Sequence, residues 1–194
     1  MDYNSEKREI KLDKELSRLD KLVLRFLDVI KKHVDYVIIS GYISILFGRS
    51  RATEDVDIFI KPLTYDEFAG LYKNLKMHGF WCLNAENPEE IYNYLKNYEA
   101  ARFAEEGMSI PNFEMKFPKR EIDKETFTDD SINVIMPEGT IKISSLERQV
   151  AFKKYYLKSD KDLEDARHIE EVFKGKIDYD KINKLKVIID NIWP

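Results

Sequence analysis

Residues 40–60 read SGYISILFGRSRATEDVDIFI, and this stretch decides both the fold and the candidate chemistry of the chain. An apolar segment runs into a Ser-Gly pair, a short apolar helix follows, and an Arg-rich loop leads to two aspartates separated by one valine. Side chains at positions i and i+2 of a strand point to the same face. A strand over residues 55–60 therefore places Asp55 and Asp57 on one face and its apolar side chains on the other, against the core.

The two carboxylates carry the first chemical hypothesis. Neighbouring groups of like charge repel each other, so Asp55 and Asp57 need a compensating partner. Mg²⁺ (or Mn²⁺) is such a partner, because these hard cations prefer oxygen ligands. Metal ions held by paired carboxylates activate an attacking oxygen and stabilise a leaving oxygen in phosphoryl chemistry. The alternative is a solvated outer face of an edge strand, where acidic and apolar residues also alternate.

The residues around the acidic pair favour the functional interpretation. Ser40 and Gly41 lie between an apolar strand and a short helix, an arrangement that lets backbone N–H groups approach a phosphate. Arg49, Arg51 and Thr53 lie between this helix and the acidic strand. Arginines can bind triphosphate oxygens in a fork, and they can also simply balance an acidic cluster.

Hydrophobic periodicity and turn residues predict an α/β body over most of the chain. Residues 1–10 are polar, and we expect them to be loosely structured. Residues 99–111 are open to two interpretations, a helix end or a hairpin. The predicted helices cover residues 11–33, 42–47, 64–79 and 88–98, and the predicted strands cover residues 36–39, 55–60, 80–83, 113–117, 132–136 and 140–143.

The chain changes character at residue 144. Residues 145–157, 162–173 and 180–189 have helical patterns with few helix breakers between them. We therefore expect an α/β domain with an N-terminal helix over residues 1–143, and a helical C-terminal part over residues 144–194 packed on it. One domain with an appendage suits a chain of 194 residues.

Composition narrows the class of protein. The chain has 32 Lys and Arg residues against 36 Asp and Glu, which gives a net charge of −4 and excludes a generally basic nucleic-acid binder. Its single cysteine, Cys82, excludes an internal disulfide. No apolar run approaches the length that spans a membrane, and the polar first ten residues do not resemble a signal peptide. We expect a cytoplasmic protein with no membrane partner.

The motif over residues 51–57, RATEDVD, together with Gly41-Tyr42, resembles the nucleotidyltransferase superfamily typified by DNA polymerase beta. It is most similar to the minimal nucleotidyltransferase and AbiEii-type branch of prokaryotic toxin–antitoxin systems. The family pattern is a strand, a Gly-Ser or Gly-Gly turn, a short helix, and Arg-x-Thr-x-Asp-hydrophobic-Asp. Tyr42 departs from it, because a small Ser or Gly is usual at this position. A tyrosine there can crowd a phosphate pocket or stack on a base. Ser40 can supply the missing hydroxyl.

The resemblance also implies a third carboxylate on a later strand. Glu114 in NFEMKF is the matching residue, although an aspartate is more usual in the family. Strand alternation puts Glu114 and Lys116 on one face, so a routine ion pair on an exposed face is the alternative interpretation.

The C-terminal helices carry a second match to the AbiEii-type branch, which has a helix lysine followed by a Lys-Asp-x-x-Asp element. In that branch the helix lysine faces the nucleotide phosphates, and the later residues support the site. The matching residues here are Lys153, Lys161, Asp162 and Asp165. Their alternative is a solvated helix face, where charged pairs are of small value.

The resemblance implies a mixed sheet flanked by helices and Mg²⁺-dependent transfer of an NMP group from an NTP such as ATP. The acceptor would be a hydroxyl of RNA, protein or a small molecule, and a cognate toxin or antitoxin would be a partner. The alternatives are a catalytically inactive nucleotide- or partner-binding regulatory module of the same fold, and a nuclease. The implied catalytic and metal residues are Asp55, Asp57 and Glu114, and the implied nucleotide-binding residues are Ser40, Gly41, Arg49, Arg51, Thr53 and Lys153.

Overall fold

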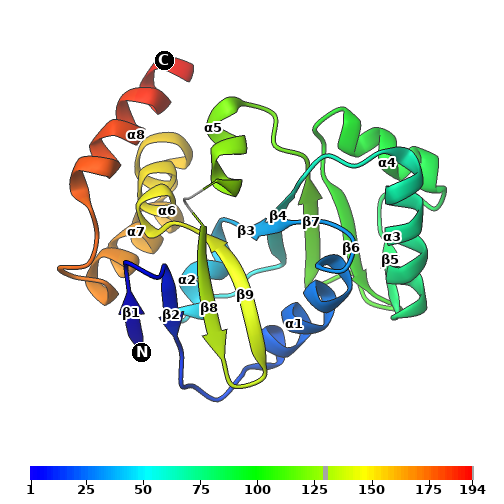
Figure 1. Cartoon of the computed structure of the whole chain (residues 1–194), viewed down its shortest axis with the longest axis horizontal. Coiled ribbons are helices and arrows are strands. Elements are labelled where there is room, and N and C mark those ends of the chain that lie inside the picture. Colours follow the sequence, from blue (N-terminus) through cyan, green and yellow to red (C-terminus); the bar gives the residue numbers. More distant parts are fainter. Residues whose placement is uncertain (129–130, 194) are drawn as a thin grey trace.

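A mixed sheet forms the centre of the computed structural model, which describes residues 1–128 and 131–193 (Figure 1). Its strands are β1 (Asp2–Asn4), β2 (Glu9–Lys11), β3 (Tyr36–Ile38), β4 (Asp55–Ile60), β5 (Phe80–Cys82), β6 (Ala101–Glu105), β7 (Asn112–Lys116), β8 (Ser131–Met136) and β9 (Gly139–Ser144). Over the described residues the nine strands are ordered β1-β2-β8-β9-β3-β4-β7-β6-β5. The β2–β8, β3–β9 and β4–β7 pairs are parallel, and the other neighbours are antiparallel.

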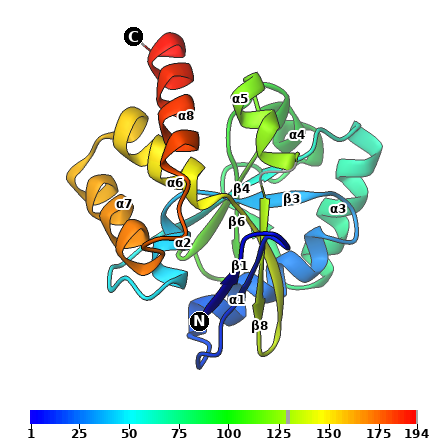
Figure 2. The same cartoon turned by 60° about the vertical axis from the view of Figure 1, so that its left-hand side comes forward.

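The helices form two groups, each packed together, with α6, α7 and α8 on one side of the molecule (Figures 1 and 2). One group is α1 (Arg18–Ile30), α3 (Tyr65–Met77) and α4 (Pro88–Lys96), and the other is α6 (Leu146–Phe152), α7 (Asp160–Val172) and α8 (Tyr179–Ile192). The remaining helical segments are α2 (Gly41–Leu46), α5 (Glu121–Lys124), the 3₁₀ turn η1 (Glu125–Phe127) and the π-helical segment η2 (Lys153–Leu157). In the described residues no helix is both long and apolar enough to cross a membrane.

The alternation of β4 and β7 decides which face of the sheet is core. Val56, Ile58 and Ile60 are fully buried, whereas the residues between them are only partly buried. Phe113 of β7 is also fully buried, and Phe26 of α1 stacks on it with ring centroids 3.9 Å apart. One face of these strands therefore packs against α1, and their polar side chains lie on the opposite face.

Several predicted elements are confirmed by the structure. The strand over residues 55–60 has the predicted bounds. Thr64 caps α3 in the predicted capping box, because its hydroxyl accepts the N–H of Glu67 while the Glu67 carboxylate accepts the N–H of Thr64. The uncertain residues 99–111 contain β6, which pairs with β7 as a hairpin.

The prediction for the N-terminal residues is wrong. Residues 1–10 were expected to be loose, but they contain β1 and most of β2, because β2 pairs with β8 far along the chain. The first helix begins at Arg18 rather than near residue 11, because Ser17 and Asp20 form a capping box there. The predicted helix over residues 145–157 turns from α-helix to π-helix at Lys153.

Tyr42 lies in the core and not in a phosphate pocket, so the expectation that it crowds phosphate or stacks on a base is wrong. Its side chain is fully buried, and its hydroxyl donates to the Asp20 carboxylate of α1 over 2.7 Å. Asp20 is also fully buried, and it accepts hydrogen bonds from the N–H and hydroxyl of Ser17 and an ion pair from Lys14 at 3.0 Å. Tyr42 therefore ties α2 to α1 through a buried carboxylate.

The Asp20 network predicts a loss of stability in acid. Burial acts to raise the pKa of Asp20, but hydrogen bonds from Ser17, Tyr42 and Lys14 outweigh it and leave that pKa below the ordinary 3.8. Asp20 therefore stabilises the fold above its unfolded pKa and loses this contribution as pH falls through the folded value. We expect Asp20→Asn to lower the free energy of unfolding at pH 7. Below about pH 4 we expect the free energies of unfolding of the variant and the unmodified chain to differ less.

Urea denaturation between pH 3 and pH 7 measures this difference. Tyr42→Phe is the matched control, because it removes one hydrogen bond and leaves the carboxylate in place. The role given to Asp20 would be contradicted if the difference in the free energy of unfolding between the Asp20→Asn variant and the unmodified chain stayed constant over this range.

Candidate active site

The parallel pairing of β4 and β7 brings the predicted carboxylates together. Asp57 lies opposite Glu114, and Asp55 lies opposite Asn112 on the same face. The side chains of Asp57 and Glu114 are 18% and 12% exposed, so both are largely withdrawn from water. Three carboxylates therefore share the polar face of the sheet: Asp55 and Asp57 come from β4, and Glu114 comes from the neighbouring β7.

Lys116 lies between two of these carboxylates. Its Nζ is 3.0 Å from Oδ1 of Asp57 and 2.8 Å from Oε2 of Glu114. Nε of Arg102 on β6 adds a hydrogen bond of 2.8 Å to Oε1 of Glu114. Glu114 and Lys116 do form an ion pair, but the pair points into the site beside Asp57.

Burial and neighbouring charges shift the pKa of Asp57, Glu114 and Lys116. Burial raises the pKa of Asp57, the charges of Asp55 and Glu114 raise it further, and Lys116 opposes them without reversing the shift. Burial also acts to raise the pKa of Glu114, but Lys116 and Arg102 hold it below its usual range. Burial acts to lower the pKa of Lys116, yet both carboxylates leave it raised. Negative charge at Asp57 is therefore only partly compensated by the protein.

The site has the donor chemistry for a divalent cation, with one obstacle. In residues 1–128 and 131–193 no three Asp, Glu, His or Cys side chains are grouped so that they could hold a metal ion as they stand. The ammonium of Lys116 occupies the position between Asp57 and Glu114. A cation is thus already bound at this point by two carboxylates, and carboxylate oxygens are the ligands that Mg²⁺ prefers. Asp57 and Glu114 fit a metal ion once Lys116 moves aside.

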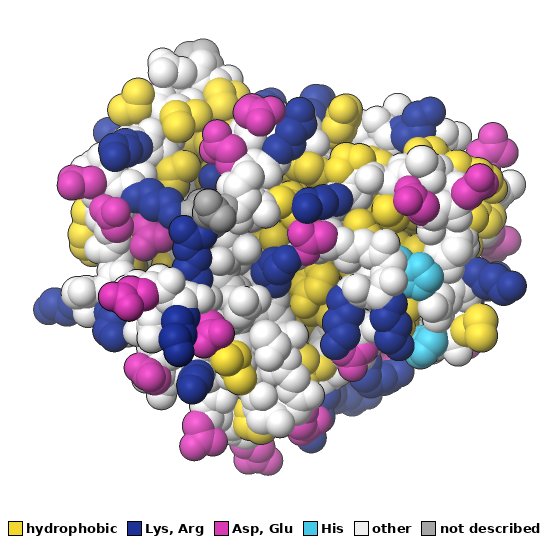
Figure 3. Space-filling view, viewed as in Figure 1, with side chains coloured by type: hydrophobic (Ala, Val, Ile, Leu, Met, Phe, Trp, Pro, Cys, Tyr) yellow, Lys and Arg dark blue, Asp and Glu magenta, His cyan; other side chains and the backbone are white. Residues whose placement is uncertain are grey.

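A cavity of about 410 Å³ opens on this face of the sheet. Asp57 and Lys116 line it from the strands, Ser40 lines it from the turn before α2, and Lys153 lines it from η2. Asp57 of the acidic pair and Ser40 of the Ser-Gly turn therefore meet at one cavity. Acidic and basic side chains are interspersed over the face of the molecule in Figure 3.

Ser40 is held in an unusual backbone conformation at the edge of the cavity. Its φ of 67° and ψ of −139° lie in a region that residues with a side chain rarely adopt. Such strain costs about 1–3 kcal/mol, and it is commonly found at sites where the backbone has a function. The conformation directs Gly41 into α2 and leaves Ser40 facing the cavity together with Asp57.

Gly41 permits a close approach by Arg51. A Cβ at Gly41 would collide with the guanidinium group of Arg51, which lies directly over the glycine. The strand-turn-helix arrangement predicts a phosphate near this turn, and in the structure the guanidinium of Arg51 lies against Gly41. Arg51 therefore fills the space beside the helix start.

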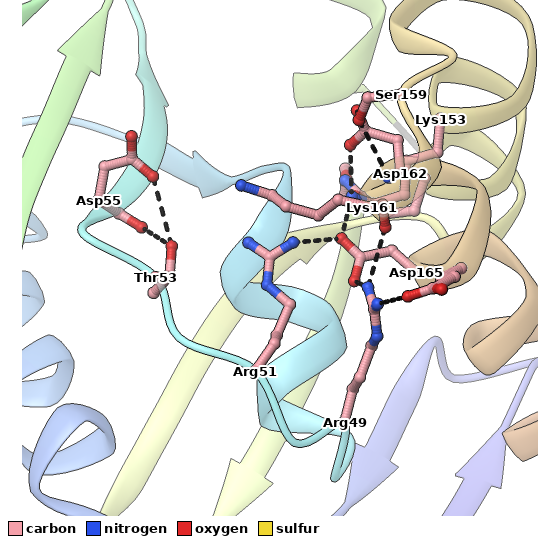
Figure 4. A network of polar contacts seen from close by, with 12 residues as sticks. Arg49, Arg51, Thr53, Asp55, Lys153, Ser159, Lys161, Asp162 and Asp165 are labelled. Atoms are coloured by element: carbon pink, nitrogen blue, oxygen red, sulfur yellow. Dashed lines mark hydrogen bonds and ion pairs between the residues drawn. The ribbon is translucent and has the colours of Figure 1, made fainter.

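Arg51 and the two other cations predicted to bind phosphate converge on one buried carboxylate (Figure 4). Asp165 of α7 is fully buried and accepts ion pairs from Arg51 at 2.9 Å, from Lys153 at 2.7 Å and from Arg49. Arg49 also pairs with Glu164. This cluster joins the loop after α2 to the C-terminal helices.

The remaining predicted residues surround this cluster and the acidic strand. Asp162 lies 3.5 Å from Nζ of Lys153, and the backbone carbonyl of Lys161 accepts a hydrogen bond of 2.9 Å from Arg49. The hydroxyl of Thr53 donates to the backbone carbonyl of Asp55 over 2.9 Å and so holds the entry to β4 (Figure 4).

The structure separates the predicted site residues into three groups. Those that line the cavity are Ser40, Asp57 and Lys153; those that lie beside it are Gly41, Asp55 and Glu114, with Thr53 bonded to Asp55; and those held in the connecting network are Arg49, Arg51, Lys161, Asp162 and Asp165. Sequence reasoning did not propose Lys116 as a site residue, although its i+2 spacing from Glu114 is the signal that would have placed it there. It also did not single out Arg120, which lines the cavity and for which the sequence carries no local signal.

The fold is similar to three solved structures of low sequence identity. The crystal structure of ANT(2'')-Ia in complex with adenylyl-2''-tobramycin aligns with a TM-score of 0.59 and 11% identity, over 92% of this chain and all of that chain. The solution structure of the antibiotic-resistance factor ANT(2'')-Ia gives a TM-score of 0.58 and 13% identity, over 89% and 91% of the two chains. The crystal structure of an antigenic nucleotidyltransferase-like protein from Paracoccidioides brasiliensis aligns with a TM-score of 0.50 and 16% identity, over 98% of this chain and 88% of that chain.

No family model matches the chain, and no curated protein matches it in sequence. The similarity to solved structures establishes the architecture: the chain has the mixed α/β fold of the nucleotidyltransferases.

Proposed function

We propose that the chain transfers an NMP group from an NTP to a hydroxyl acceptor with the help of Mg²⁺ or Mn²⁺. The observation that carries this proposal is the cavity shared by Asp57, Ser40 and Lys153, with Glu114 beside Asp57. The fold supports it, and one structural neighbour is bound to adenylyl-2''-tobramycin, an adenylylated molecule of the kind that such chemistry produces. A fold by itself does not define an activity, so the site residues carry the argument.

The protein groups have separate tasks in this proposal. Asp57, Asp55 and Glu114 would hold the divalent cation, which when bound neutralises charge on the phosphates and polarises the reacting oxygen. Lys153 and the Ser40 hydroxyl contact phosphate oxygens, and Glu114 accepts the proton of the acceptor hydroxyl. The acceptor oxygen bonds to the α-phosphorus, the bond from that phosphorus to its bridging oxygen breaks, and pyrophosphate leaves.

The two parts of the chain contribute differently to this site. We propose that the body over residues 1–143 supplies the carboxylates and that the helical part over residues 144–194 supplies Lys153 and the far wall of the cavity. Asp165 then acts as a positioning residue, because it fixes Lys153 and Arg51 without lining the cavity. We propose the cytoplasm as the place of action and a toxin–antitoxin system of the AbiEii type as the context.

A regulatory module of the same fold is the second candidate function. The observation that favours it is Lys116, which occupies the position between Asp57 and Glu114. A permanent internal cation would leave no room for a metal ion. Tyr42, the other reason for considering an inactive module, lies in the core and does not obstruct the cavity.

Lys116→Met distinguishes the two functions. Without its ammonium, Asp57 loses its ion-pair partner and Glu114 keeps only Arg102, so we expect the variant to have a lower melting temperature in the absence of a divalent cation. We expect Mg²⁺ to raise the melting temperature of Lys116→Met more than that of the unmodified chain, because bound ligand stabilises by mass action. Thermal unfolding at increasing Mg²⁺ concentration measures both effects.

Lys142→Met is the matched control. Lys142 pairs with Asp35 outside the cavity, and its side chain is 31% exposed against 29% for Lys116. Each substitution removes an ion-pair partner from a partly buried carboxylate. Only Lys116→Met does so for two carboxylates, Asp57 and Glu114. Equal responses of the two variants to Mg²⁺ would reject a cation site at Asp57 and favour the regulatory module.

A further inference from the structure

Aromatic rings and cations form the mouth of the cavity, and the proposed chemistry uses none of them. The guanidinium of Arg120, at the start of α5, lies 4.4 Å from the ring centroid of Trp193 at the end of α8. Tyr156 of η2 packs on Trp193 with ring centroids 4.2 Å apart and an interplanar angle of 35°. Arg120, Trp193 and Tyr156, here named the mouth cluster, all line the cavity that Asp57 lines.

A second pair of the same kind lies beside the mouth cluster. The ammonium of Lys119 is 5.7 Å from the ring centroid of Tyr98, and both residues line the cavity. Tyr98 and Tyr156 are 47% and 40% exposed, so both phenol rings keep large accessible surfaces. Exposed rings that already face cations offer planar surfaces on which another flat group can stack.

Cationic residues outnumber acidic ones in the cavity lining, although Lys116, Arg148 and Lys153 are already paired with carboxylates. Its cationic residues are Lys116, Lys119, Arg120, Arg148 and Lys153, and its acidic residues are Asp57 and Asp123. Within residues 1–128 and 131–193 no carboxylate pairs with the side chain of Lys119 or Arg120. The mouth therefore presents two cations whose charge is not neutralised by a described acidic group, and it attracts anions.

We propose that the mouth cluster binds the acceptor, and that the acceptor is a nucleotide: a flat base carrying phosphate. This inference rests on the proposed function, because it assigns the inner end of the cavity to the NTP phosphates. The base stacks on the exposed Tyr156 beside Trp193, and its phosphate pairs with Arg120 or Lys119. A polycationic acceptor such as an aminoglycoside is disfavoured, since it would be repelled by the same two cations.

Trp193 makes the proposal directly measurable. The chain has two tryptophans, and Trp81 is an exposed residue of β5 that does not line the cavity. Trp81→Phe leaves Trp193 as the only tryptophan, so its fluorescence reports on the mouth cluster. The probes are AMP, ribose 5-phosphate, which lacks the base, and tobramycin, which is a polycation.

We expect AMP to change the Trp193 fluorescence with a saturable dependence on concentration, and ribose 5-phosphate and tobramycin to change it little. No response to AMP, or tighter binding of tobramycin than of AMP, would overturn the proposal. A four-nucleotide RNA separates two sources of the same chemistry. Tighter binding than AMP assigns the cluster to an RNA end, and equal or weaker binding assigns it to a free nucleotide.

Tyr156→Leu, made in the single-tryptophan chain, tests whether the acceptor or the NTP uses the cluster. We expect it to weaken AMP binding about tenfold or more, the usual size of one base-stacking contact, while the affinity for Mg·NTP measured by calorimetry stays unchanged. Tyr179→Leu is the matched control, because Tyr179 is 53% exposed on α8 and does not line the cavity. Unchanged AMP binding, or a parallel loss of NTP affinity, would overturn the assignment.

Failure of this inference can be told apart from failure of the proposed function. Asp57→Asn removes a proposed metal ligand at the inner end and leaves the mouth cluster untouched. Persistent AMP binding at Trp193 in that variant, with no transfer by the unmodified chain, would reject the proposed chemistry and keep the nucleotide site. Transfer by the unmodified chain without any AMP response would reject the nucleotide site alone.

Discussion

Asp57→Asn is expected to lower the rate of NMP transfer by roughly 10³-fold or more. The change keeps the shape of the side chain but removes the carboxylate that lines the cavity and lies opposite Glu114. Charge stabilisation by a catalytic metal ion amounts to several kcal/mol, and about 1.4 kcal/mol corresponds to a factor of ten in rate. Labelled NTP incubated with cell RNA, with cell protein and with AMP measures the transfer.

The control for this variant is Asp13→Asn. Asp13 is an exposed aspartate before α1 and does not line the cavity, so its loss should leave transfer unchanged. Asp55→Asn should behave like Asp57→Asn, because both carboxylates lie on the same face of β4. Transfer that survives in the Asp57→Asn variant at more than about a tenth of the original rate would remove Asp57 from the reaction, since that is less than 1.4 kcal/mol.

Asp165→Asn is expected to lower the free energy of unfolding by about 3–5 kcal/mol, the range measured when one partner of a buried ion pair is removed. The fully buried Asp165 is shared by Arg49, Arg51 and Lys153, and the side chain of Lys153 is only 1% exposed. Its neutralisation leaves three cations close together without their common anion. Urea denaturation followed by circular dichroism measures the change.

Glu164→Gln is the matched control from the same helix. Glu164 pairs with Arg49 alone, and its side chain is 60% exposed, so its loss should cost no more than about 1 kcal/mol. A similar cost for the two variants would show that Asp165 is not the anchor of the cluster. The Asp165→Asn variant should also bind NTP more weakly at temperatures where it is folded, because Lys153 loses its fixed position.

Local sequence patterns were enough to predict those structural features that depend on residues close together in the chain. The alternation of β4 predicted both its bounds and the shared face of Asp55 and Asp57, because strand geometry fixes these by sequence spacing alone. The capping box at Thr64 and Glu67 predicted the start of α3 for the same reason. The nucleotidyltransferase fold followed from the resemblance carried by residues 51–57 and agrees with the solved structures.

Features that depend on distant residues could not be derived in this way. The register that puts Glu114 opposite Asp57 follows from the order of strands in the sheet. The engagement of Arg51 by Asp165 joins residues 114 positions apart, and the pairing of β2 with β8 spans a similar distance. A polar residue such as Asp20 is assigned to the surface unless its buried partner, Tyr42, is known.

The most direct test of the central claim is isothermal titration calorimetry of each NTP with and without Mg²⁺, on the unmodified chain and on Asp57→Asn. We predict binding of at least one NTP that depends on Mg²⁺ and is lost in Asp57→Asn. Absence of binding by every NTP, or binding that is equally strong without Mg²⁺ and in the variant, would contradict a nucleotide site at the Asp57 cavity.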